Sequence, residues 1–186
     1  MRMHRLAVVA LVGLGAVGMS ACYDGNTAAK TVAPVTLSES ITEGPADVDI
    51  SLPVDVIIKT MTISSKAKSP SATLSQQDDV ILTDWVITCI RTDGGTVVSP
   101  QWQNFYSVYV PAGGTANVAN YRIFPADFFT QPPLNQLFPE NGGYDKETAK
   151  RSIRQRLHIE IFGKTVAGRA ISLPFDVNLN FFYQTP

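Results

Sequence analysis

The sequence contains little cysteine and little histidine. Its 186 residues include two of each, namely Cys22, Cys89, His4 and His158. A small disulfide scaffold needs several paired cysteines, and a zinc centre built from cysteine and histidine needs three or four such ligands. We therefore expect neither a disulfide framework nor a zinc centre, and we expect no cofactor.

A strong excess of either charge is also missing. The chain has 15 basic and 16 acidic residues, which gives a formal net charge of −1. Nucleic-acid-binding proteins usually carry a clear basic excess, so we expect no nucleic-acid partner. We interpret a local basic group, diluted by acidic neighbours, as solvated surface rather than as a site for anionic lipid headgroups; it comprises Lys146, Lys150, Arg151, Arg154 and Arg156.

No apolar run is long enough to span a bilayer as a helix, which takes about 20 residues. The run Leu6–Met19 follows Arg2 and Arg5 and precedes the small residues Ser20 and Ala21. A positive segment, an apolar segment and a small-residue cleavage site, in this order, indicate a secretory signal peptide. The sequence also lacks a Gly-x-Ser-x-Gly nucleophile elbow, so a serine hydrolase of that type is not indicated.

The stretch Met19-Ser20-Ala21-Cys22 resembles the lipobox of bacterial lipoproteins. In that family the cysteine is linked to a diacylglycerol, the chain is cut just before it, and the new amine is acylated. The resemblance implies a signal peptide over residues 1–21 and anchoring in a lipid bilayer through acylated Cys22. Several acyl chains on one residue hold a protein at a membrane, at about 0.8 kcal/mol per buried CH₂. The alternative is an ordinary secretory signal with an unmodified cysteine.

The residue after the cysteine bears on location within the cell envelope. In some bacteria an aspartate there retains a lipoprotein at the inner membrane. Here Tyr23 follows Cys22. The resemblance therefore implies the outer membrane rather than the inner one, with the rest of the chain facing the periplasm or the cell exterior.

The remainder divides into a tether and one domain. Residues 22–46 are rich in Thr, Ala, Ser, Gly and Pro without a sustained period, which is typical of a flexible tether, although residues 32–37 could dock as an edge strand. Residues 47–186 are long enough for one domain with a sizeable core.

The domain opens on an alternating run. Apolar residues at every second position predict a strand whose core face comprises Val48, Ile50, Leu52, Val54, Val56 and Ile58. Pro53 cannot donate to a ladder, so it predicts an edge or a break. The apolar phase flips after Lys59, which predicts a bulge near Lys59-Thr60.

Further strands follow with turn residues between them. Residues 80–91 are apolar on both faces and predict a central strand, with Trp85, Ile87 and Cys89 on one face. Residues 104–110 and 117–124 predict two more strands, and alternation over 153–161 and 171–181 predicts a β-hairpin.

About seven strands and little helix predict an all-β domain, an antiparallel β-sandwich. In size and rhythm it resembles an immunoglobulin-like domain, but Cys89 has no second core cysteine for an inter-sheet bridge. We expect Cys89 to be a core residue.

Residues 128–143 contain many apolar residues but no helix or strand period. A long irregular segment in a compact domain is often functional. We therefore select its apolar side chains as candidates for binding a partner; they are Phe128, Phe129, Leu134, Leu137 and Phe138. The alternative is that they fold back and cap one end of the core.

Candidate chemistry is sparse. His158 falls on the outward face between Arg156 and Glu160, where a solvated role is expected. Aspartates at alternate positions, Asp47, Asp49 and Asp55, would be the first candidates for calcium, and Trp102 and Tyr106 for a glycan.

The sequence therefore predicts a non-catalytic, membrane-anchored envelope lipoprotein that acts as a binding or structural module for another envelope component, which we expect to be a protein. Two alternatives remain: an envelope hydrolase that uses His158, and a calcium- or glycan-binding module.

Overall fold

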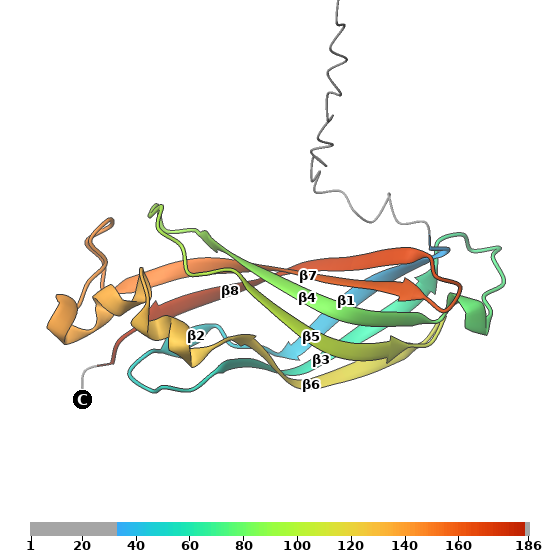
Figure 1. Ribbon diagram of the computed structural model, residues 1–186, viewed down its shortest axis with the longest axis horizontal. Coiled ribbons are helices and arrows are strands. Elements are labelled where there is room, and N and C mark those ends of the chain that lie inside the picture. Colours follow the sequence, from blue (N-terminus) through green and yellow to red (C-terminus); the bar gives the residue numbers. More distant parts are fainter. Residues whose placement is uncertain (1–32, 185–186) are drawn as a thin grey trace, which may run out of the picture.

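The computed structural model describes residues 33–184, which form eight strands in two sheets (Figure 1). The strands are β1 (Val35–Glu43), β2 (Asp47–Asp49), β3 (Val56–Ala67), β4 (Val80–Arg91), β5 (Trp102–Val110), β6 (Thr115–Phe124), β7 (Ser152–Thr165) and β8 (Ala170–Phe182). Short 3-10 helices occur at Gln76–Asp78 (η2), Ala126–Thr130 (η3), Leu134–Leu137 (η4) and Pro139–Asn141 (η5). This part of the chain contains no α-helix, which confirms the all-β prediction.

Among the helices of residues 33–184, none is both long enough and apolar enough to cross a bilayer.

One sheet has the order β1-β3-β6 and the other the order β2-β8-β7-β4-β5. Neighbouring strands are antiparallel, except that β2 runs parallel to β8. Apolar side chains of both sheets form one core, in which Trp85, Ile87 and Cys89 of β4 are buried as predicted. Burial raises the pKa of the Cys89 thiol to about 12, so the thiol is neutral at physiological pH.

The first strand includes residues that the sequence assigns to the tether. Residues 35–43 pair with β3 from Val35–Ala67 to Glu43–Thr60, so β1 is an edge strand of the three-stranded sheet. The edge strand considered at residues 32–37 thus extends to Glu43.

The predicted irregularity near Lys59-Thr60 is present. Both residues are exposed in succession, while Ile58 and Met61 on either side are buried. Opposite Lys59 on β6, Asn120 has a φ of 52°, a left-handed conformation that asparagine tolerates better than most residues. The phase flip in the sequence therefore corresponds to this pair of exposed residues, whereas the register shifts of the sheet lie between Val56 and Ile57 on β3 and between Ile41 and Glu43 on β1.

Gly163 has a different role from the expected one. Gly163 lies between the two alternating runs 153–161 and 171–181, where the predicted hairpin would turn, but β7 continues to Thr165, and the turn follows at residues 166–169. A Cβ on Gly163 would lie 2.2 Å from the carbonyl oxygen of Ile81, next to the register shift in β4. Position 163 therefore requires glycine, because the backbone of β4 leaves no room for a Cβ atom.

The two ends of the domain differ. We call the end at which the described chain begins the near end and the opposite end the far end. The near end carries the loops 68–79, 111–114 and 166–169 (Figure 1). The far end carries residues 44–55, 92–101 and 125–151, together with the end of β8. Backbone hydrogen bonds tie the near-end loops to one another: Val166 donates to the carbonyl of Asp79, and Ala167 to that of Gln77.

Candidate functional site

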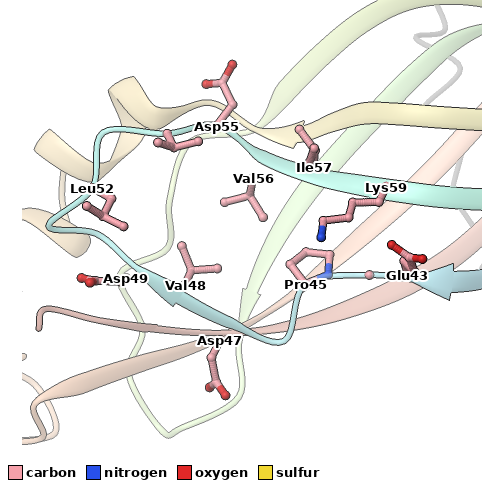
Figure 2. A pocket seen from close by; sticks show the side chains of 12 residues that line it. Glu43, Pro45, Asp47, Val48, Asp49, Leu52, Asp55, Val56, Ile57 and Lys59 are labelled. Atoms are coloured by element: carbon pink, nitrogen blue, oxygen red, sulfur yellow. The ribbon is translucent and has the colours of Figure 1, made fainter.

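A groove of about 650 Å³ opens at the far end, where the chain passes from one sheet to the other. Figure 2 shows its two walls: the start of β3 forms one, and the end of β1 together with β2 forms the other. The turn between β2 and β3 closes one side. The lining residues are Glu43, Gly44, Pro45, Asp47, Val48, Asp49, Leu52, Val54, Asp55, Val56, Ile57 and Lys59.

The groove exists because β3 extends beyond its partner on one edge. The ladder between β1 and β3 ends at Glu43–Thr60, whereas β3 begins at Val56. On the other edge, β3 stays paired with β6 as far as Val56. The groove-facing backbone edge of residues 56–59 therefore has no neighbouring strand, and no other backbone hydrogen bond of residues 33–184 covers it.

Local sequence explains why β1 leaves β3 at this point. The register shifts between Ile41 and Glu43, and such a bulge bends a strand. Gly44 follows, where a Cβ would lie only 2.9 Å from Cγ2 of Ile41. Pro45 then lacks the N–H that a ladder would need. The chain crosses to the other sheet, and Asn180 of β8 donates to the carbonyl of Ala46 at 2.8 Å.

Aliphatic side chains form the floor of the groove. Val48 and Val56, one from each wall, are buried, while Leu52 and Val54 are 58% and 65% exposed. The prediction that Leu52 and Val54 lie in the core is wrong. β2 ends at Asp49 and the next strand begins only at Val56, so the break expected at Pro53 is real and the alternation does not continue through it.

Three aspartates hold the walls in place. Asp49 accepts hydrogen bonds from the backbone N–H of Ser51 at 3.0 Å and of Gln184 at 3.1 Å. Asp55 accepts from the N–H of Ala126 at 2.8 Å and pairs with Arg122 of β6 at 3.1 Å. Asp47 accepts from Nδ2 of Asn180 at 2.9 Å. Because its turn and both walls are fixed by these bonds, the groove is preformed.

The charges of the lining are unbalanced. The lining includes four carboxylates, those of Glu43, Asp47, Asp49 and Asp55, and one ammonium group, that of Lys59. The carboxylates of Asp47 and Asp55 point away from the space between the walls (Figure 2), and Asp55 is paired with Arg122. Within the described part of the chain, the side chains of Glu43 and Lys59 form no hydrogen bond or ion pair. The groove therefore combines an apolar floor with an acidic surround and two charges that are free to meet a ligand.

A buried ion cluster braces the rest of the far end. Nε of Arg91 lies 2.7 Å from Oδ1 of Asp93, and Nη2 lies 2.7 Å from Oδ2 of Asp145; all three side chains are at most 2% exposed. Burial raises the pKa of Asp145, but hydrogen bonds from Thr148 and Arg91 outweigh it and hold the pKa below its ordinary value. The cluster joins loop 92–101 to segment 125–151.

The apolar side chains chosen from residues 128–143 lie mostly in the core. Phe129, Leu134 and Leu137 are buried, and Phe128 and Phe138 are half-buried against the core. Three 3-10 helices return the chain on itself, so that Phe129 packs against Phe124 and Phe181. This arrangement matches the alternative in which the segment caps one end of the core.

His158 lies on the outer face of the five-stranded sheet and is paired. Its Nδ1 is 2.8 Å from Oδ1 of Asp176 on β8, and Thr88 is its register partner on β4. A hydrolase would need a hydroxyl bonded to the imidazole. Among the side-chain hydrogen bonds of residues 33–184, the imidazole of His158 makes only the one to Asp176, and both side chains are about one-third or more exposed.

The residues considered for calcium and glycan binding have other partners. No group of three or more His, Cys, Asp and Glu side chains in residues 33–184 is arranged to hold a metal ion. The guanidinium of Arg122 lies 5.2 Å from the ring centroid of half-buried Trp102. The ring of Tyr106 contacts the rings of Trp85 and Tyr121.

Comparison with known proteins adds no assignment. No protein-family model matches the chain, and no curated protein matches it in sequence. Cys22, the predicted lipidation site, lies outside the described residues. The groove is not predicted by the sequence patterns, although two of them, Pro53 inside an alternating run and the phase flip after Lys59, fall beside it.

Proposed function

We propose that the protein is a non-catalytic lipoprotein of the bacterial cell envelope, anchored through acylated Cys22 and in the outer rather than the inner membrane. Its folded domain binds or supports another envelope protein. The lipobox-like stretch carries the anchoring half of this proposal, and the groove at the far end carries the binding half.

We infer further that the domain is an immunoglobulin-like sandwich. Sheets ordered β1-β3-β6 and β8-β7-β4-β5 correspond to the strand orders A-B-E and G-F-C-C′ of such domains. The buried Trp85 on β4 stands where immunoglobulin domains carry a buried tryptophan on strand C. Buried aliphatic residues, among them Ile63 on β3 and Ile159 on β7, fill the core between the sheets in place of an inter-sheet disulfide.

One observation connects the two halves of the functional proposal. The described chain begins at the near end, and the groove lies at the far end (Figure 1). A chain tethered to a bilayer before residue 33 then holds the near end toward the membrane and presents the groove away from it. This is the arrangement that a membrane-displayed binding module needs.

Intact mass and cell fractionation test the anchor. Wild-type protein from the producing bacterium is expected in the membrane fraction, with a mass equal to residues 22–186 plus a diacylglyceryl group and one acyl chain. Cys22→Ala should lose these groups and leave the membrane fraction. A wild-type protein with an unmodified, uncleaved or soluble chain would contradict the proposal.

Crosslinking in cells tests the binding half. A photocrosslinker at Val54, in the groove, is expected to join the protein to one specific envelope protein. The same group at Val166, which is similarly exposed at the near end, is the matched control and should not do so. Equal crosslinking from both positions would contradict the assignment of binding to the far end.

A further inference from the structure

We propose that the groove binds an extended segment of another protein as an added β-strand, and that this segment carries aliphatic side chains and a net positive charge. The inference deepens the proposed function: it rests on the role of the domain as a binding module, and it names the mode of binding and the chemistry of the partner.

The backbone of β3 provides the first reason. Its residues 56–59 have an uncovered edge on the side that β1 covers from Thr60 onward. Neighbouring residues of a strand direct their N–H and C=O groups to opposite edges, so two of the four residues face the groove. An incoming strand that continues the line of β1 would make about four backbone hydrogen bonds there, which is the mode of peptide recognition called strand addition.

The floor provides the second reason. Side chains of an added strand would point alternately into the groove and away from it. Those that point inward would meet Val48 and Val56, with Leu52 and Val54 from the turn beside them. Burial of a valine or leucine side chain on binding removes apolar surface from water and stabilises the complex, so the aliphatic floor favours a partner with aliphatic residues.

Charge selects the sign of the partner. With Arg122, which pairs with Asp55, counted beside Lys59, the four carboxylates of the lining leave a net charge of −2, and the carboxylate of Glu43 has no partner within residues 33–184. At physiological ionic strength a charge is felt over about 8 Å, so a basic residue at either end of the segment would be attracted. A second copy of this chain would bring the same acidic lining, and like charges repel, so it is disfavoured as the occupant.

Preorganisation favours binding over collapse of the groove. The hydrogen bonds that Asp49 and Asp55 accept fix the turn and the first residues of β3 in the absence of a ligand. A partner therefore does not have to order these walls, and that ordering would otherwise reduce the affinity.

Peptide binding to the full, detergent-purified chain tests this inference. The probe is a fluorescent peptide of about nine residues that alternates valine with threonine and lysine. The controls are the same peptide with glutamate in place of lysine, and one with proline at its centre. We expect the basic peptide to bind at least tenfold more tightly than either control and to slow amide hydrogen exchange in residues 54–60.

Paired variants locate the contact. Glu43→Lys should weaken binding about tenfold, whereas Glu39→Lys, the same change on the same strand but outside the groove, should leave it within twofold. Leu52→Asp should abolish binding, and Val166→Asp at the near end should not.

Three results would overturn the inference: no binding of the basic peptide at millimolar concentration, equal binding of the acidic peptide, or exchange protection elsewhere in the chain. Self-association of the chain that protects residues 54–60 without peptide would also overturn it, because the occupant would then be a second copy. None of these results touches the mass of the anchored chain, so a failure here is distinguishable from a failure of the lipid anchor.

Discussion

Two apolar segments at the far end of the domain differ in the burial of their side chains. Residues 126–141 form three 3-10 helices that direct Phe129, Leu134 and Leu137 into the core. The turn of residues 50–55 instead leaves Leu52 and Val54 open to solvent. Both segments connect strands, and both are rich in apolar residues.

The difference lies in what each backbone does. Both segments make local backbone bonds, such as Phe128 N–H to Pro125 in the longer one and Val54 N–H to Leu52 in the turn. Only the longer segment returns on itself through three 3-10 helices, which direct its side chains inward. The short turn has to carry the chain from one sheet to the other, and β1 has already left β3 at that point. Accessible apolar surface therefore arises here where strand pairing stops, rather than where apolar residues are most concentrated.

The largest effect should come from emptying the packed segment. Phe129→Ala removes a buried ring that packs against Phe124 and Phe181, and we expect it to lower the free energy of unfolding by about 3–5 kcal/mol. Urea denaturation followed by tryptophan fluorescence measures this. Phe105→Ala is the control, because Phe105 is 74% exposed, and should change stability by less than about 0.5 kcal/mol. A similar small loss for both variants would show that the segment is not part of the core.

A similar loss should follow from breaking the ion cluster that holds this segment. Arg91→Ala leaves the buried carboxylates of Asp93 and Asp145 without their cation, and we expect a loss of about 3–5 kcal/mol. Arg122→Ala breaks the half-exposed pair with Asp55 and should cost no more than about 1 kcal/mol. If the two variants were equally stable, the cluster would not brace the far end.

Acid should weaken the same cluster. The pKa values of Asp93 and Asp145 are lowered in the folded protein: burial opposes the shift, but hydrogen bonds and the charge of Arg91 outweigh it. The unfolded state then binds more protons than the folded state near pH 4, so the stabilisation is complete above the unfolded value of about 3.9 and is lost as the pH falls through the folded values. Urea midpoints measured from pH 7 to pH 3 should therefore decrease once the pH drops below about 3.9. Asp145→Asn should be less stable at pH 7 and should show a flatter decline.

Much of the fold follows from sequence patterns. The alternation over residues 153–161 and 171–181 predicts the hairpin of β7 and β8, and the apolar run 80–91 predicts a central strand, which β4 is. These patterns work because each strand keeps one regular face on the core. Pairing between strands distant in the chain is not encoded in such local patterns, so the crossing of β1 and β2 between sheets could not be predicted.

The candidate site depends on that crossing. Leu52 and Val54 continue the alternation of Val48 and Ile50, and by pattern alone they belong to the core. Whether they are buried depends on where β1 stops pairing, a property of residues 41–45 acting on another strand. Conversely, the apolar segment at residues 128–143 has no period, and only its 3-10 turns show which side chains face inward.

The smallest effect on stability should come from the groove itself. Replacing Leu52 and Val54 together by serine removes aliphatic side chains that are more than half exposed, so the free energy of unfolding should change by no more than about 0.5 kcal/mol. The same double variant should lose binding of the basic valine peptide, because the exposed floor is then polar. Urea denaturation and peptide titration on the same preparation measure both. A large loss of stability would mean that the turn belongs to the core after all, and retained peptide binding would mean that the aliphatic floor is not what the partner contacts.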